Sequence, residues 1–442
     1  MKITFIKPSI GCKPSVRYAE KHVMEPLEFA VLAGLTPPEI DIELFDDRIE
    51  KIHYDNHTNL VAITTDTFTA RRAYGICLAF RERRVPVVLG GCHPTLVPDE
   101  AVEYADSVVV GEAEDTWRQV IQDAERGKLE RIYKSDQRPS LDNIKPRRDI
   151  FRGKRYISPA LVEFGRGCNF HCSFCAVGAM YNYTHNHRPV EDVVEEIRNL
   201  RKKEIFFVDD NIIANIDKAK ELFEALIPLR INWSSQISIN FVRDRSLLRL
   251  MVESGCRDLF IGFESLDKRN LKLMNKQCNF SFDRYEPALE SIRETGIRVW
   301  ASFILGCDYD SKESFEETFD FAMKQKLFLA NFNNLIAYPG TPLYDSLLKE
   351  NRLLYDKWWL NTRFRFGHAV FTPRNISPAE LTDWCYSLRL RYNSYSAILR
   401  RGLEFRANCR NLNSAISFLT YNLVFRGEVQ RKQGMILGYK DE

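Results

Sequence analysis

An alternation of short apolar segments with helix-like ones runs through the first 125 residues and constrains the fold more than any other feature. Helical spacing of apolar residues is found in PLEFAVLAGL, ARRAYGICLAFRERR and PDEAVEYA. Around these stretches lie five strand-like segments: KITFI, EIDIELF, LVAIT, VPVVLGG and SVVVGE. Apolar strands that alternate with helices form parallel sheets covered on both faces. We therefore expect a doubly wound α/β domain over residues 1–126, Rossmann-like in plan, with ligands at the carboxyl ends of its strands.

A second alternation follows a charged connection. Residues 127–158 lose the pattern and are rich in charge and proline, which predicts a linker. Residues 159–345 then contain six further strand segments, LVEF, EIFFV, NWSSQI, LFIG, VWASFIL and NFNNLIAY. Six strand–helix repeats predict a partial (β/α)6 barrel of TIM-like type, with functional groups at the carboxyl ends of the strands. Residues 346–442 lack strand segments and predict a helical C-terminal region.

Composition limits the class of protein and its location. The net charge of +3 is small for 442 residues and does not indicate a nucleic-acid-binding protein. The N-terminal apolar run is too short for a signal peptide, and no window reaches the roughly 18 apolar residues of a membrane span. We therefore expect a cytoplasmic protein.

The C-terminal region is locally basic. Residues 389–432 hold nine Lys or Arg and two Glu. This composition fits a surface that contacts an anionic lipid or substrate peripherally, and it also fits helices that pack on the barrel and expose a solvated basic face. The sequence leaves both interpretations open.

Three cysteines in the segment GRGCNFHCSFCAVG carry the most specific chemical signal. Cys168, Cys172 and Cys175 have the spacing C-x3-C-x2-C directly after the first barrel strand. In a reducing compartment, clustered cysteines indicate a metal centre. Three thiolates hold three corners of a cubane iron–sulfur cluster and leave the fourth iron open. A structural zinc site would instead need a fourth ligand, for which the candidates are His171, His185 and His187.

The other eight cysteines are scattered singly. Each is interpreted as a small buried hydrophobic residue. They are Cys12, Cys77, Cys92, Cys256, Cys278, Cys307, Cys385 and Cys409.

The cysteine loop resembles that of the radical S-adenosylmethionine (radical SAM) superfamily, which also has an aromatic residue, here Phe174, before the last cysteine. The resemblance implies a [4Fe–4S] cluster whose open iron binds SAM, and reductive cleavage of SAM to a 5′-deoxyadenosyl radical. It also implies a flavodoxin- or ferredoxin-like electron donor. The segments FFVDDN, LFIGFES, FILGCD and YPGTPLY match the family's SAM-binding strand ends, which implies SAM contacts from Phe174, Asp209, Asp210, Asn211, Glu264, Gly306, Pro339 and Gly340.

The first domain resembles that of the cobalamin-binding class of this superfamily. The stretch VVLGGCHPTLVPDEAVEYADSVVVGEAEDTW is similar to the class pattern GG-x-H-x-T…G-E-x-E. The chain lacks the motif D-x-H-x-x-G, whose histidine ligates cobalt, because DNHTNL ends in Leu60; members of the class often lack it too. The resemblance implies cobalamin contacts from Gly90, Gly91, His93, Thr95, Gly111 and Glu112. The alternative is that His93 forms hydrogen bonds within this tight turn, as histidines in such turns often do.

These features favour a radical SAM enzyme that methylates an unactivated carbon of a small-molecule or lipid-like substrate with the help of cobalamin. The alternatives are a non-methylating radical SAM oxidoreductase, cyclase or rearrangement enzyme, and a non-catalytic iron–sulfur or cobalamin sensor. A methylthiotransferase fits less well, because that reaction usually needs a second cysteine trio in the N-terminal domain. The substrate is expected between the two domains, within reach of Tyr181, Tyr183 and Arg188, and no catalytic acid or base is identified.

Overall fold

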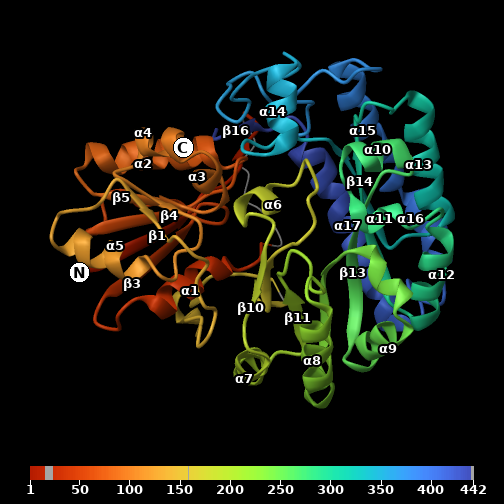
Figure 1. Cartoon of the computed structure of the whole chain (residues 1–442), viewed down its shortest axis with the longest axis horizontal. Coiled ribbons are helices and arrows are strands. Elements are labelled where there is room, and N and C mark those ends of the chain that lie inside the picture. The colour runs from red at the N-terminus through yellow and green to blue at the C-terminus, as the bar shows by residue number, and fades with distance from the viewer. Residues whose placement is uncertain (15–22, 158, 440–442) are drawn as a thin grey trace.

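The first domain is built on a parallel sheet, as predicted. The computed structural model describes residues 1–14, 23–157 and 159–439 (Figure 1). Strands β3, β1, β4, β5 and β6 lie side by side in this order, the flavodoxin-like order of doubly wound folds. Their bounds are β1 Lys2–Lys7, β3 Asp41–Asp46, β4 Leu60–Thr64, β5 Val87–Gly90 and β6 Ser107–Val110.

The predicted linker contributes a sixth strand to this sheet. β7 (Ile132–Lys134) pairs in parallel with β6. Only Tyr133 of its three residues is buried, so no apolar segment marks the strand in the sequence. Residues 127–158 therefore complete the first sheet in addition to connecting the domains, and they also contain the short 3-10 helix η1 (Arg148–Phe151).

Helices cover both faces of the first sheet (Figure 1). Three of them were expected from apolar spacing, whereas α3 and α5 were not. α3 contains a proline and is one turn long, which hides its helical character. The helices are α1 Leu27–Leu35, α2 Ala70–Glu82, α3 Cys92–Leu96, α4 Pro98–Tyr104 and α5 Trp117–Glu125.

The second sheet is an open barrel of six parallel strands, in agreement with the prediction. Its order is β15-β14-β13-β12-β11-β8, so each strand lies beside its neighbour in the sequence of repeats. The strands are β8 Ala160–Val162, β11 Glu204–Phe207, β12 Asn232–Ile237, β13 Cys256–Glu264, β14 Arg298–Leu305 and β15 Leu329–Asn334. The crossover helices include α7 Val190–Leu200, α8 Ile216–Leu226, α9 Arg245–Glu253, α12 Glu286–Thr295 and α13 Lys312–Lys324. Shorter helices between the strands are η2 Ile227–Leu229, η3 Ile239–Arg243, α10 Lys268–Leu273 and α11 Gln277–Phe280.

A small hairpin follows the first barrel strand and was not predicted. β9 (Gly165–Gly167) pairs antiparallel with β10 (His185–His187). The cysteine loop and the short helix α6 (Ala176–Met180) lie between these two strands in the chain. Figure 1 shows α6 between the first domain and the barrel, so the hairpin brings the three cysteines to the side that faces the first domain.

The C-terminal region is helical, as expected, and returns to the first domain at its end. Its last strand, β16 (Ile436–Leu437), pairs antiparallel with β2 (Gly11–Cys12). The helices are α14 Pro342–Lys349, α15 Pro378–Tyr392, α16 Tyr395–Gly402 and α17 Leu412–Lys432. None of the described helices is both long and apolar enough to cross a membrane.

A buried glutamate joins the C-terminal region to the first domain. Oε1 of Glu100 accepts hydrogen bonds from Tyr74 Oη at 2.9 Å and from Trp359 Nε1 at 2.8 Å, and it lies 3.2 Å from Nε2 of His93. Lys357 adds an ion pair at 3.1 Å. Burial by itself raises the pKa of Glu100, but the side-chain hydrogen bonds from His93, Trp359, Lys357 and Tyr74 together lower it to about 2.

This network makes stability depend on pH. A carboxyl group whose pKa is lower in the folded than in the unfolded protein contributes stability that is complete above its unfolded value, about 4.3, and is lost as the pH falls toward about 2. We expect Glu100→Gln to reduce the free energy of unfolding at pH 7 by about 2 kcal/mol, and to lose less stability than the wild type on acidification. Urea unfolding at neutral and at acidic pH checks this. Glu103→Gln, an exposed position on the same helix, is the control and should behave as wild type.

Candidate active site

The three cysteines of the loop are free thiols in a partly buried setting. Cys172 is buried, and Cys168 and Cys175 are of intermediate exposure. The loop is fixed by its backbone: the amide of Ser173 donates to the carbonyl of Met274 at 2.9 Å, and the amide of Cys175 to the carbonyl of Cys172 at 3.2 Å. The loop thus presents three sulfur donors from one short, anchored turn, as a cubane cluster requires.

The electrostatic setting of the thiols favours an anionic metal centre. Burial raises the pKa of all three thiols, that of Cys172 to about 12. The ammonium group of Lys276 opposes this rise at each of them. Bound iron displaces the protons from such thiols, and Lys276 then lies close enough to compensate the negative charge of the thiolates.

The geometry is unfavourable to the zinc alternative. Among the described residues, no group of three or more His, Cys, Asp or Glu is close enough to hold a single metal ion. Two of the three candidate histidines also make other contacts: His171 stacks on Tyr183 with ring centroids 4.3 Å apart, and Nδ1 of His187 lies 3.1 Å from the carbonyl of Arg188. Burial lowers the pKa of His185 to about 4. A cubane is larger than one ion, so its ligands stand further apart.

The two aspartates predicted to bind SAM hold the backbone that leads into the cysteine loop. The carboxylate of Asp209 is buried and accepts hydrogen bonds from the amides of Phe164, at 3.1 Å, and Gly165, at 2.5 Å. Asp210 accepts from the amide of Gly167 at 2.8 Å. Burial raises the pKa of Asp209 well above its usual value and that of Asp210 to about 6. Both are therefore positioning residues in this structure, and a SAM contact from either stays a prediction.

Asn211 connects the same strand end to the first cysteine. Its Nδ2 donates to Sγ of Cys168 at 3.9 Å. Its Oδ1 accepts from the amide and hydroxyl of Ser238, which follows β12. Three neighbouring strand ends thus meet at Cys168.

Glu264, predicted from the motif LFIGFES, forms a buried ion pair beside the cysteines. Its Oε1 lies 2.9 Å from Nζ of Lys276. Glu264 has φ +61°, a left-handed conformation that is uncommon for residues other than glycine and is often found at functional sites. A Cβ at Gly262 would lie 2.1 Å from Oε1 of Glu264. Glycine at 262 is thus required for this pair to form where it does.

A further cysteine lies in this cluster and was not singled out by the sequence. Cys278 is buried on α11, and its thiol donates to Oδ1 of Asn279 at 3.2 Å. Burial raises the pKa of the Cys278 thiol, and the charges of Lys276 and Cys168 also act on it, so the thiol lies close to the loop. Neither Lys276 nor Cys278 belongs to a recognisable spacing, so only the fold brings them to the loop.

Of the remaining predicted SAM residues, Gly306 directly follows β14, Pro339 and Gly340 lie in the segment after β15, and Phe174 lies in the cysteine loop. The amide of Gly306 donates to Asp310 at 2.8 Å. Pro339 is buried, and a Cβ at Gly340 would meet the Leu96 side chain of the first domain at 3.2 Å. Phe174 is half-buried against the core shared by the first domain and the C-terminal region. Their contacts with SAM stay predictions.

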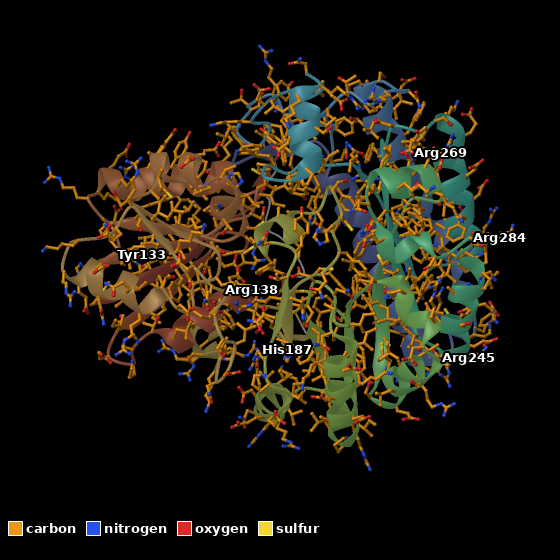
Figure 2. The ribbon with its side chains drawn as sticks, in the orientation of Figure 1. Tyr133, Arg138, His187, Arg245, Arg269 and Arg284 are labelled. Carbon is orange, nitrogen blue, oxygen red and sulfur yellow. The ribbon has the colours of Figure 1, made fainter. Side chains whose placement is uncertain are left out.

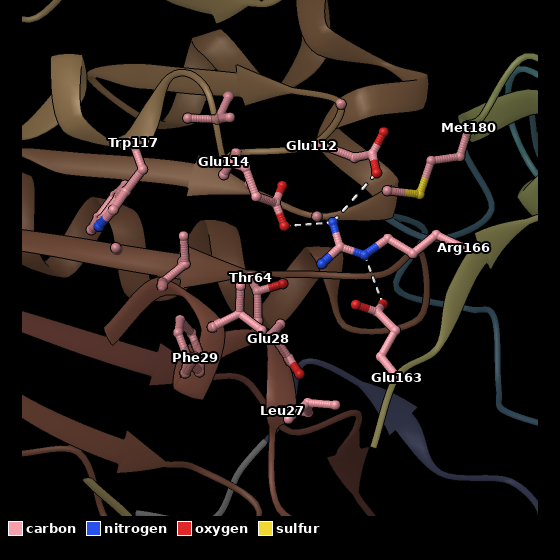
Figure 3. A pocket seen from close by; sticks show the side chains of 18 of the residues that line it. Leu27, Glu28, Phe29, Thr64, Glu112, Glu114, Trp117, Glu163, Arg166 and Met180 are labelled. Atoms are coloured by element: carbon pink, nitrogen blue, oxygen red, sulfur yellow. Dashed lines mark hydrogen bonds and ion pairs between the residues drawn. The ribbon is translucent and has the colours of Figure 1, made fainter. Parts of the chain in front are cut away.

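A cavity of about 310 Å³ opens at the carboxyl edge of the first sheet (Figure 3). One wall comes from the first domain and includes Gly90, Gly91, Gly111 and Glu112. The other wall comes from the barrel side and includes Met180 and Tyr181, which follow the cysteine loop. The cavity therefore lies between the two domains, where the sequence places the substrate.

Two of the predicted glycines leave free space at the floor of the cavity. A Cβ at Gly90 would find only Val109 within 4 Å, at 3.9 Å, and a Cβ at Gly111 would find nothing. Gly91 is required for the turn itself, since it has φ +104° and a Cβ there would lie 2.7 Å from the carbonyl oxygen of Thr65. The edge therefore allows a ligand to approach the backbone closely.

Two of the three predicted polar contacts of the first domain, Thr95 and His93, have structural roles. Oγ1 of Thr95 donates to the carbonyl of Gly91 at 2.8 Å and accepts from the amide of Gly111 at 2.9 Å, so it ties the two glycine loops together. His93 is completely buried in the Glu100 network and does not line the cavity. A cobalt ligand from His93 is thus disfavoured by its position.

Charged side chains cluster on the cavity wall, and of these the sequence analysis singled out only Glu112. Arg166, on β9, lies 2.6 Å from Glu114, 2.7 Å from Glu163 and 3.4 Å from Glu112 (Figure 3). Arg138 forms a bidentate pair with Glu112, at 2.6 and 2.9 Å, and lies between the two halves of the molecule (Figure 2). Three carboxylates of the two domains are thus held by two arginines from the linker and the hairpin.

The three residues expected near the substrate are separated by the fold. Tyr181 lines the cavity, with the guanidinium of Arg138 4.6 Å from its ring centroid. Tyr183 stacks on His171. Arg188 is buried and donates to the carbonyl of Glu163 at 3.0 Å, so it supports the wall from behind.

Comparisons with known proteins agree with this site. The family model of the radical SAM superfamily matches residues 162–322. The bacteriochlorophyllide d C-12(1)-methyltransferase of Chlorobaculum tepidum is 31% identical over 392 residues, covering 86% of this chain and 85% of that protein. The hopanoid C-2 methylase of Rhodopseudomonas palustris is 27% identical, covering 75% of this chain and 66% of that protein.

A solved structure shares the whole architecture. The cobalamin-dependent S-adenosylmethionine radical enzyme OxsB, with aqua-cobalamin and S-adenosylmethionine bound, has a TM-score of 0.66 at 13% identity, covering 97% of this chain and 71% of that one. The likeness shows that the two domains are arranged in the same fold. We conclude that the chain belongs to the radical SAM superfamily, in the class with a cobalamin-binding-type domain before the barrel. It is an enzyme of the methyltransferase type within that superfamily.

The assignment of the cluster ligands can be tested by substituting a loop cysteine and its buried neighbour Cys278 in two separate variants. We expect Cys172→Ala to lose most of the iron and sulfide that the wild type binds on anaerobic reconstitution, because one corner loses its ligand. Cys278→Ala is the matched control and should bind the same amounts as wild type. Iron and sulfide analysis with visible absorbance measures both, and loss of the cluster in Cys278→Ala with retention in Cys172→Ala would contradict the assignment.

Proposed function

We propose that this protein transfers a methyl group from cobalamin to an unactivated carbon of a small molecule. One observation carries the proposal: the cavity at the open, glycine-lined sheet edge of the first domain is closed on the barrel side by Arg166, Met180 and Tyr181, which lie just before and just after the three-cysteine loop in the chain. Methyl transfer to a carbon that has no acidic hydrogen needs both a hydrogen-abstracting group and a methyl carrier near one substrate atom. The cavity supplies such a meeting point.

The residues of the chain fit the groups that the fold implies. Cys168, Cys172 and Cys175 would hold three irons of a [4Fe–4S] cluster, and Asn211 and Lys276 line its surroundings. When bound, the cluster and SAM supply a 5′-deoxyadenosyl radical, and methylcobalamin supplies the methyl group. The chain's own part is to orient these groups and to exclude water from the cavity.

The open glycine edge accounts for the cobalamin side of the proposal. Backbone at Gly90 and Gly111 leaves room that a side chain would fill, and Thr95 fixes the two loops. Arg166 and Arg138 hold the facing walls together through Glu112. These contacts keep the cavity at one width, which a reaction between two bound groups requires.

The substrate is proposed to be an apolar polycyclic or lipid-like molecule. Most of the cavity wall is apolar, with Phe29, Val88, Trp117 and Met180 among its residues. The relatives' names give a bacteriochlorophyllide and a hopanoid as their substrates. We infer that a flavodoxin- or ferredoxin-like protein supplies the electron. We also infer that the C-terminal region contacts a membrane peripherally.

The product pattern distinguishes methyl transfer from other radical chemistry. Reconstituted protein with SAM, hydroxocobalamin and a strong reductant is expected to form S-adenosylhomocysteine together with 5′-deoxyadenosine, because the reductant converts the carrier to cob(I)alamin, which takes the methyl group of one SAM, and reductive cleavage of a second SAM gives the radical. Liquid chromatography with mass spectrometry measures both products. Formation of 5′-deoxyadenosine alone would indicate a radical oxidoreductase, cyclase or rearrangement enzyme, and formation of neither would favour a non-catalytic sensor.

The cobalamin site has a separate test that does not depend on turnover. Gly90→Leu places a side chain into the cavity without backbone strain, so we expect cobalamin binding to weaken by at least about tenfold, since a leucine's volume must be displaced. Gly75→Leu, at an exposed glycine of α2 with open space around it, is the control. Equilibrium dialysis against cobalamin, with iron content as a check of the cluster, gives the comparison. Equal cobalamin binding by the two variants would mean that cobalamin does not bind at this edge.

A further inference from the structure

Exposed apolar side chains gather on two C-terminal helices. Among the described residues, nineteen large apolar side chains are exposed, and eight of them lie within residues 395–423. The other eleven are dispersed over the rest of the described chain. The eight are Tyr395, Leu399, Leu403, Phe405, Leu412, Ile416, Leu419 and Leu423. Single exposed apolar residues are common on protein surfaces, but a concentration of this kind indicates an interaction site.

The side chains on α17 form one stripe. Leu412, Ile416, Leu419 and Leu423 follow each other at intervals of four, three and four residues, which places them on one face of the helix. Leu412 is 76% exposed. The opposite face packs on the barrel, where Phe418 is buried and Asn422 donates to the carbonyl of Phe328 at 3.3 Å. α17 therefore carries apolar side chains on both faces, although the described residues cover only one of them.

Exposed apolar side chains on α16 and on the turn after it lie beside the stripe on α17. Leu399 and Phe405 are each 66% exposed. The two helices touch where Gly402 meets Phe418, and the guanidinium of Arg426 on α17 lies 4.2 Å from the ring centroid of Tyr395 on α16. The exposed residues of both helices therefore belong to one surface, which we call the α16–α17 face. Figure 1 shows these blue helices in the barrel half of the molecule.

The charge of the α16–α17 face has one predominant sign. Residues 395–432 contain seven Lys or Arg and two Glu; Glu404 and Arg401 are buried, and Arg406 forms an ion pair with Glu290. Arg400 and Arg410 are exposed next to the apolar side chains. Basic side chains at the border of an apolar surface match the phosphates and the acyl boundary of an anionic bilayer. A second copy of the chain would bring these arginines against like charges.

We propose that the α16–α17 face docks the protein on the surface of an anionic membrane. The exposed leucines enter the acyl boundary, and Arg400 and Arg410 contact lipid phosphates. This names the surface and the lipid class for the membrane contact inferred under the proposed function, and it does not depend on methyl transfer or on any cofactor. Docking of this kind gives an enzyme access to an apolar substrate that is dissolved in the bilayer.

Vesicle binding of the purified full-length protein tests the proposal. Wild-type protein is expected to co-sediment with phosphatidylcholine vesicles that contain phosphatidylglycerol, and to bind vesicles of phosphatidylcholine alone far more weakly. Leu412→Gln combined with Leu423→Gln should weaken binding by at least about tenfold, since each side chain loses apolar burial. Arg400→Gln and Arg410→Gln should each weaken it about fivefold, an effect that added salt reproduces.

The control is a leucine of similar exposure elsewhere. Leu78→Gln on α2, where Leu78 is 44% exposed, should bind as wild type does. Circular dichroism checks that all variants are folded. Binding that is equal for the α16–α17 variants and the wild type would overturn the proposal, as would no binding by the wild type. Sedimentation equilibrium identifies the other occupant: a dimer that Leu412→Gln dissociates would assign the face to a second copy of the chain.

Discussion

Two neighbouring carboxylates at the end of β11 fix the entry to the cysteine loop, and the site depends on them. Asp209 accepts the amides of Phe164 and Gly165, and Asp210 accepts the amide of Gly167, immediately before Cys168. A loop of glycines and cysteines has many conformations of its own, so its position must be set by its neighbours. Burial of both carboxylates strengthens these hydrogen bonds, because little water competes for the amides. The backbone that presents the three thiols is thereby fixed by its neighbours.

The second requirement is that the first domain keeps a fixed position relative to the cysteine loop. The Glu100 network attaches the C-terminal region to α2, α3 and α4, while Arg166 and Arg138 attach the hairpin and the linker to the loop after β6. Gly340, which follows β15, lies so near the first domain that a Cβ there would meet the Leu96 side chain at 3.2 Å. The domains are thus joined on several sides of the cavity, and a cofactor on the glycine edge would face SAM at a constant separation.

The sequence predicted the repeating elements well and the joining elements poorly. The strands and helices could be predicted because an element that buries one whole face has apolar residues at regular intervals along its sequence. The hairpin β9–β10, the helix α3 and the strand β7 have three to five residues each, which is too short for a period to appear. Cys168, Cys172 and Cys175 were identifiable because the three ligands are close in sequence, whereas Lys276 and Cys278 reach them only through the fold. His93, a residue within a matching motif, is buried in the Glu100 network, and its predicted cobalamin contact stays a prediction.

The central claim is that the three-cysteine cluster has one iron free of protein ligands and that SAM binds to it. Electron–nuclear double resonance on the reduced protein with SAM labelled with ¹⁵N at its amino group tests this directly. The account predicts a hyperfine coupling between the labelled nitrogen and the cluster. A spectrum without that coupling, and unchanged when SAM is added, would mean that side chains already occupy all four irons or that SAM binds elsewhere.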